Sequence, residues 1–124
     1  MHWIAIALGG SLGALARYGV VRMVARGSAF PLLTGTLVAN LLGCFALGAI
    51  LTLVHEREAF SAAARDFLTV GLLGSFTTFS TFGWETHELV RSGEWRLAGL
   101  YVAANVVVGL AAVAGGRAVV RAFA

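Results

Sequence analysis

The stretch from Gly71 to Glu85, GLLGSFTTFSTFGWE, holds the residues with the greatest capacity for chemistry. It lies inside an apolar span, yet hydroxyl side chains recur through it, at Ser75, Thr77, Thr78, Ser80 and Thr81. At membrane depth, hydroxyl oxygens can bond the backbone groups that an interruption of a helix sets free. The sequence therefore predicts a break around residues 74–78, where exposed carbonyls could hold a cation.

Phenylalanine recurs every third residue in the same stretch, and Phe79 and Phe82 share one face of the helix that resumes after the break. The edge of a phenyl ring is positive, so it can contact an anion without carrying a formal charge. Such a stripe often serves packing alone. A neighbouring polar row at helical spacing, Thr77, Thr81 and Glu85, favours a pore wall.

Two further spans carry an asparagine near their middle. Asn40 lies in a row of small and polar residues with Thr36, Cys44 and Gly48, and Asn105 lies between Tyr101 and Gly109 at the same spacing. An amide inside a membrane must find a partner, which is either another helix or a passing anion.

Arg17 is the one basic residue that does not lie near the end of a span. A charge at the centre of a membrane helix costs about 2.5–3.5 kcal/mol on insertion scales, so such residues are usually functional or reach the interface. Two interpretations stay open. Arg17 attracts anions into a water-filled vestibule, or its side chain extends to the membrane surface.

The composition predicts a membrane protein. The chain has 124 residues, of which 59% are hydrophobic and 12% charged. We expect one all-α domain with four transmembrane helices, at about residues 3–24, 30–54, 67–90 and 97–118, the third broken at its centre. The basic residues other than Arg17 lie near span ends, which indicates membrane anchoring and no nucleic-acid partner.

Covalent chemistry is not indicated. The sequence lacks a phosphate-binding loop, an HExxH motif and a nucleophile elbow. Its histidines sit at span edges without partners at ligand spacing, and Cys44 is the only cysteine. We expect a protein that is not an enzyme.

The loop arginines are balanced between the two sides of the membrane. One side carries Arg57, Arg65, Arg117 and Arg121, and the other carries Arg22, Arg26, Arg91 and Arg96. Because arginine and lysine in short loops set orientation, such a balance allows insertion in both directions and an antiparallel homodimer. The alternative is chance in a small count.

These motifs resemble the Fluc (CrcB-type) fluoride channels. The resemblance rests on GALARY with Arg17, GTLVANLLGCFALG with Asn40, and GLLGSFTTFSTFGWE, and it extends over the whole chain. It implies an antiparallel, dual-topology homodimer in a bacterial or archaeal cytoplasmic membrane. Two pores would carry fluoride passively out of the cell and so protect it from fluoride toxicity.

The resemblance also implies a role for each candidate residue. Backbone carbonyls of Gly74 and Thr77 would hold a structural sodium ion, and Arg17 and Glu85 would lie in the vestibule. The fluoride pore would be lined by Asn40, Phe79, Phe82, Thr78, Ser80, Thr81, Tyr101 and Asn105. The chain departs from the family at Asn105 and Gly109, where hydroxyl residues often stand.

Two rival functions are weighed against the channel. A small multidrug transporter needs a membrane-embedded carboxylate, but the first span here has no acid and carries Arg17 instead. A structural membrane subunit would use its small residues to pack helices and would not require the hydroxyl and phenylalanine pattern.

Overall fold

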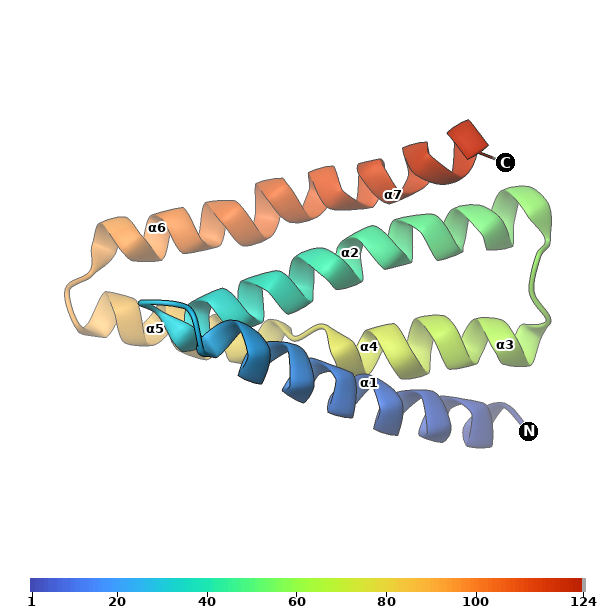
Figure 1. Ribbon diagram of the computed structural model, residues 1–124, viewed down its shortest axis with the longest axis horizontal. Helices are drawn as coiled ribbons and strands as arrows, with labels where there is room; N and C mark the ends of the chain where they lie inside the picture. Colours follow the sequence, from blue (N-terminus) through green and yellow to red (C-terminus); the bar gives the residue numbers. More distant parts are fainter. Residues whose placement is uncertain (124) are drawn as a thin grey trace.

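The computed structural model describes residues 1–123 as helical segments that run alternately up and down, with both termini at the same end (Figure 1). The first two segments are α1 (His2–Ala25) and α2 (Pro31–Arg57). The third comprises α3 (Ala62–Asp66), the π-helix η1 (Phe67–Leu73), α4 (Gly74–Phe76) and α5 (Phe79–Arg91). The fourth comprises α6 (Trp95–Ala103), the π-helix η2 (Ala104–Val108) and α7 (Gly109–Phe123). No strand occurs in residues 1–123, and the predicted all-α class is confirmed.

Local sequence explains where the segments begin and end. Pro31 occupies the first turn of α2, where its missing N–H would have no helical partner. The Ser61 hydroxyl caps α3 by accepting a hydrogen bond from the backbone N–H of Ala64 at 3.3 Å. The turn between α5 and α6 contains Gly93 at φ 84°, a conformation that favours glycine.

Helices long and apolar enough to cross a membrane are α1, α2 and the continuous run from Trp95 to Phe123. These correspond to the predicted spans 3–24, 30–54 and 97–118, each extended by a few residues. The predicted span 67–90 corresponds to η1, α4 and α5. It is not one continuous helix, because α4 ends at Phe76 and α5 begins at Phe79.

The outer surface of the bundle is apolar. Large hydrophobic side chains are exposed along its length, among them Trp3, Leu15, Val107 and Leu110. Soluble monomers rarely expose continuous apolar surface on this scale, whereas lipid covers such a surface without cost. The exposed side chains therefore agree with a bundle whose solvent is the bilayer.

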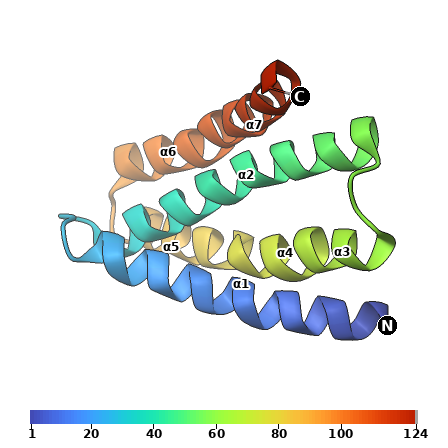
Figure 2. The same cartoon turned by 45° about the vertical axis from the view of Figure 1, so that its right-hand side comes forward.

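Glycines let the helices approach closely, and Figure 2 shows α2 lying between the third segment and the fourth. A Cβ atom built on Gly13 of α1 would lie 2.1 Å from the carbonyl oxygen of Leu72. On α2 and α7, a Cβ on Gly48 would lie 2.2 Å from the Val113 oxygen, and a Cβ on Gly116 only 2.0 Å from the Phe45 oxygen. These contacts are backbone to backbone, the packing mode expected of small residues in membrane helices.

Charged contacts fasten the end of the bundle where the termini lie. Glu56 of α2 accepts hydrogen bonds from Arg121 and, at 3.2 Å, from Arg117, both of α7. The hydrogen bond from Arg121 is the main cause that lowers the pKa of the Glu56 carboxyl below its ordinary value, and the charge of Arg117 adds to it. Nδ1 of His2 lies 2.5 Å from a carboxylate oxygen of Asp66, which joins α1 to α3.

The sequence does not predict the two π-helical turns. In the third segment η1 ends directly before Gly74, and in the fourth segment η2 contains Asn105. In η2, the Asn105 side chain donates to the backbone carbonyl of Tyr101 at 3.0 Å. Widened turns of this kind are frequent at functional sites because they redirect side chains.

Candidate functional site

Two consecutive extended residues interrupt the third segment near the middle of the bundle. Thr77 has φ −84° and ψ 159°, and Thr78 has φ −150° and ψ 116°. Thr78 also caps α5, because its hydroxyl oxygen accepts a hydrogen bond from the backbone N–H of Thr81 at 3.2 Å. Both residues fall within the interval where the sequence predicts a break.

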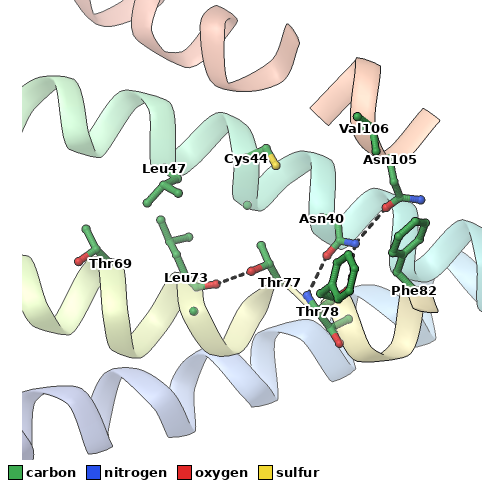
Figure 3. Close-up of a pocket in the computed structure, with 13 residues that line it drawn as sticks. Asn40, Cys44, Leu47, Thr69, Leu73, Thr77, Thr78, Phe82, Asn105 and Val106 are labelled. Atoms are coloured by element: carbon green, nitrogen blue, oxygen red, sulfur yellow. Dashed lines mark hydrogen bonds between the residues drawn. The ribbon is translucent and has the colours of Figure 1, made fainter. Parts of the chain in front are cut away.

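The Asn40 side chain of α2 forms hydrogen bonds with both the N–H and the carbonyl group of Thr78. Its Oδ1 accepts from the Thr78 N–H at 2.8 Å, and its Nδ2 donates to the Thr78 carbonyl at 3.2 Å. The same nitrogen donates to Oδ1 of Asn105 at 3.0 Å. Figure 3 shows the two amides bridging from α2 to the break on one side and to the fourth segment on the other.

The interruption changes the partners of two backbone carbonyls. In a continuous helix, the Gly74 carbonyl would accept from the Thr78 N–H and the Thr77 carbonyl from the Thr81 N–H. Those two N–H groups donate instead to Asn40 Oδ1 and to the Thr78 hydroxyl. Neutral carbonyl oxygens released from a helix suit an alkali cation. The sodium site predicted at Gly74 and Thr77 requires oxygen ligands of this kind, and one of the two, the Thr77 carbonyl oxygen, accepts a hydrogen bond from Arg17 in this structure.

Arg17 lies beside the same break. Its Nη1 is 3.5 Å from the carbonyl oxygen of Thr77, and the contact is partly buried. The side chain therefore turns toward the centre of the bundle in this structure. Its positive charge would lie close to any cation held by the Thr77 carbonyl.

The two phenylalanine rings of α5 have contrasting environments. Phe82 is 9% exposed and packs against Tyr101, with ring centroids 5.4 Å apart. Phe79 is 82% exposed although its ring centroid lies 5.6 Å from that of Phe82. Phe82 is therefore held in place by the fourth segment, whereas Phe79 projects from this chain.

A cavity of about 320 Å³ brings several candidate residues together. It lies between α2, the break and the fourth segment, as Figure 3 shows. Candidate residues on its wall are Asn40, Gly74, Thr77, Thr78, Phe79, Phe82 and Asn105. All of its lining residues within the described chain are uncharged. Amides and hydroxyls are its main polar side-chain groups, and the two phenyl rings share the wall with aliphatic side chains such as Leu47, Leu73 and Val106.

A second cavity, of about 370 Å³, lies on the α1 side of the break and has charged walls. Arg17 and Glu85 both line it, and so do Thr78 and Thr81. Thr78 borders both cavities, so the interrupted backbone separates a charged compartment from an uncharged one.

Glu85 is a buried carboxylate with partners on two other helices. It is 7% exposed, and it accepts from the Thr36 hydroxyl at 2.9 Å and from the Tyr101 hydroxyl at 2.5 Å. These two bonds join α5 to α2 and α6. The sequence singles out each of the three residues, but their meeting depends on the register of three helices and could not be predicted from spacing.

Ser80 and Thr81 are placed less centrally. Both are exposed on the first turn of α5 and contact the Thr78 hydroxyl, at 3.4 Å and 3.0 Å. Gly43 also lies on the wall of the uncharged cavity, although nothing in the sequence marks it as a site residue. A Cβ there would lie 2.2 Å from the Thr77 methyl group, so the absence of a side chain makes room for the break.

Comparison with known proteins gives consistent matches along the chain. Residues 4–117 match the family described as CrcB-like protein, Camphor Resistance (CrcB). A Roseiflexus sp. (strain RS-1) protein named Fluoride-specific ion channel FluC is 45% identical over 123 residues, which cover 98% of each chain. A protein of the same name from Chloroflexus aurantiacus is 48% identical over 112 residues, covering 89% of this chain and 87% of its own. Another, from Rhizobium johnstonii, is 42% identical over 123 residues, covering 98% of this chain and 97% of its own.

Proposed function

The chain belongs to the CrcB-like family, and we propose that it is a fluoride-specific ion channel that lets cytoplasmic fluoride leave the cell down its electrochemical gradient. Such passive export protects a cell from fluoride toxicity. The observation that carries the proposal is the uncharged cavity of about 320 Å³ beside the helix break, with Phe79 and Phe82 on its wall.

This cavity suits a small, strongly hydrated anion. A conducting site must replace the hydration shell of the ion and still release it, which favours many weak donors over one fixed charge. Amide hydrogens and the positive edges of phenyl rings provide such donors. In the neighbouring cavity, the Arg17 guanidinium would attract anions, and Glu85 borders the same vestibule.

The proposed channel is an antiparallel, dual-topology homodimer with two pores. Phe79 projects from the chain at the edge of the cavity, so that a second copy would complete the wall. The balance of four loop arginines on each side permits the opposite insertion that this dimer requires. Labelling of single-cysteine variants from both sides of a cell membrane tests the topology, and labelling from one side only would contradict it.

The proposed dimer holds a structural sodium ion through backbone carbonyls of Gly74 and Thr77. Two released carbonyls from each copy would supply oxygen ligands at the centre of the assembly. Thermal melting of the purified protein should shift to lower temperature when N-methylglucamine replaces sodium. An unchanged melting temperature would contradict a sodium site.

We place the protein in the cytoplasmic membrane of a bacterium or archaeon. All four helical segments would cross this membrane. Three helices of the described chain have the length and composition to span a bilayer, and the third segment lies among them. Fractionation of cells that express a tagged chain tests the location, and recovery of the protein in the soluble fraction would contradict it.

Fluoride efflux from liposomes tests the function directly. Purified protein is reconstituted into liposomes that contain potassium fluoride. Valinomycin lets potassium leave and so balances the charge carried by fluoride, while a fluoride electrode records the release. We expect rapid fluoride release, and no chloride release in a matched preparation. Absence of fluoride release from well-folded protein would refute the channel.

Substitution of the two rings tests the pore wall. Phe79→Ile and Phe82→Ile should each slow fluoride efflux, because isoleucine has no aromatic edge for the anion. Phe123→Ile is the matched control, since Phe123 is 89% exposed at the far end of α7 and lies outside both cavities. If both Phe79→Ile and Phe82→Ile release fluoride at the wild-type rate, the two rings serve packing and not conduction.

A further inference from the structure

A third cavity, of about 330 Å³, lies between α2 and α7 at the end of the bundle where both termini lie (Figure 1). Its lining residues include Gly48, Leu51, His55, Glu56, Val113 and Arg117. None of these residues lines either of the cavities beside the helix break. The third cavity is therefore separate from the candidate ion site.

The walls of this cavity change from apolar to polar along both helices. On α2, Leu51 is followed one turn later by His55, and on α7, Val113 is followed one turn later by Arg117. At a rise of 1.5 Å per residue, each step places the polar residue about 6 Å closer to the end of the bundle. A phospholipid has the same order, with acyl chains toward the centre of the bilayer and the phosphate at its surface.

Arg117 has unused capacity to bind an anion. Both oxygens of Glu56 accept hydrogen bonds from Nε of Arg121, at 3.1 Å and 3.0 Å. Arg117 adds one hydrogen bond to this carboxylate, from Nη2 at 3.2 Å, and its side chain is 55% exposed. A guanidinium has five N–H groups in a planar fork that suits phosphate oxygens. Since two guanidinium groups face one carboxylate, this cluster carries a net positive charge that a second anion can balance.

We propose that this cavity is a binding site for an anionic phospholipid. Arg117 donates to the headgroup phosphate, Arg121 lies beside it, and the start of an acyl chain lies along Leu51 and Val113. Basic pockets between transmembrane helices are a setting in which acidic lipid headgroups bind. The site concerns the membrane environment of the protein and does not depend on ion conduction.

The surroundings of the cavity favour a lipid over a soluble anion. Both helices that form it belong to segments long and apolar enough to cross a membrane. On α7, Leu110 is 68% exposed on one side of Arg117, and Val119 is 44% exposed on the other. Lipid covers apolar side chains of this kind in a bilayer, so acyl chains would lie next to the Arg117 guanidinium.

Native mass spectrometry of the detergent-purified protein tests the site by counting bound lipids during titration. Phosphatidylglycerol should bind at least roughly 5-fold more tightly than phosphatidylcholine, because each arginine near an anionic lipid contributes about 1 kcal/mol. Arg117→Gln should weaken phosphatidylglycerol binding by roughly 5-fold and leave phosphatidylcholine binding unchanged. Arg26→Gln is the control with the same loss of charge, because Arg26 is exposed in the turn between α1 and α2, at the opposite end of the bundle.

Two results of this titration would overturn the site. The first is equal affinity of the wild-type protein for the two lipids. The second is an equal loss of phosphatidylglycerol affinity in Arg117→Gln and Arg26→Gln.

Removal of the Glu56 charge separates lipid binding from a purely structural role of the arginines. Glu56 competes with the lipid phosphate for Arg117 and Arg121, so Glu56→Gln should tighten phosphatidylglycerol binding by up to roughly 5-fold. If the arginines only fasten α7 to α2, the loss of this contact would leave lipid binding unchanged or weaken it. Either of these outcomes would overturn the proposal.

A soluble headgroup analogue distinguishes a lipid from a free anion. Glycerol 3-phosphate carries the phosphate without acyl chains, so at equal concentration it should not displace phosphatidylglycerol. Displacement would identify a site for soluble phosphate compounds and overturn the lipid assignment. Because none of these measurements uses fluoride, the lipid site can fail while the proposed channel stands, and the reverse is equally possible.

Discussion

Replacing Gly43 with alanine should impair conduction through steric pressure on the helix break. The added Cβ would lie 2.2 Å from the Thr77 methyl carbon and 3.3 Å from a ring carbon of Phe76. Carbon atoms in contact are normally about 3.5–4.0 Å apart, so the methyl must move by about 1.3 Å or more. Thr77 lies at the interruption and on the cavity wall, so this displacement falls on the candidate site.

Rotation of the Thr77 side chain offers little relief. Its hydroxyl donates to the Leu73 carbonyl at 3.0 Å, and rotation away from Gly43 would break this bond. Overpacking of this kind costs about 1–3 kcal/mol. If that cost falls on the conducting conformation, we expect fluoride efflux to slow by roughly 5- to 150-fold, because 1.4 kcal/mol corresponds to a tenfold change.

The assay compares efflux rates per reconstituted protein with those of a control variant. Gly99→Ala is suitable because nothing lies within 4 Å of a Cβ at that position, and alanine favours a helix over glycine. Helical content and elution volume should match those of the wild type in both variants. If Gly43→Ala conducts at the wild-type rate with an intact fold, then the close fit of Gly43 against the break is irrelevant to conduction.

Two predictions concern stability of the purified protein in detergent. Gly116→Ala should lower the stability by about 1–3 kcal/mol, because its Cβ would lie 2.0 Å from the Phe45 carbonyl oxygen. Gly115→Ala is the control and should leave the stability unchanged, because its Cβ would lie 3.8 Å from the Phe45 ring; equal melting temperatures for the two variants would contradict this account of the α2–α7 contact. Arg121 lowers the pKa of Glu56, so the stability from this pair is present above about pH 4.3, the pKa of an unperturbed glutamate, and is lost as the pH falls through the lower folded value. Glu56→Gln should therefore lose less stability than wild type when the pH is lowered from neutral to below the folded pKa of Glu56. If the melting temperatures of the two proteins fall equally over that range, Glu56 does not contribute to stability in this way.

The fold class could be predicted because the bilayer allows few solutions. Uncharged apolar runs as long as residues 30–54 and 97–116 cross a bilayer as helices, which bond their own backbone within the segment. The break within the third span carries a local signal of glycines and hydroxyl residues, and the extended Thr77 and Thr78 lie inside the predicted interval. Both features depend on near neighbours in the sequence, which composition and spacing describe well.

The partners of the polar residues could not be predicted in the same way. The sequence places Glu85 on a polar row but gives no indication that Thr36 and Tyr101 would meet its two oxygens. That meeting depends on how three helices slide and rotate against one another. The widened turn at η2 changes this register further, since it redirects Asn105 relative to a regular α-helix.

The interruption and the polar cavity have a common physical origin. Breaking a helix inside a membrane frees backbone donors and acceptors, and other protein groups must satisfy them. Here the freed donors are bonded by side chains, the Thr78 N–H by Asn40 and the Thr81 N–H by the Thr78 hydroxyl. The side chains that make the break tolerable are therefore the ones that line the cavity, which explains why an ion pathway can be built where the helix is least regular.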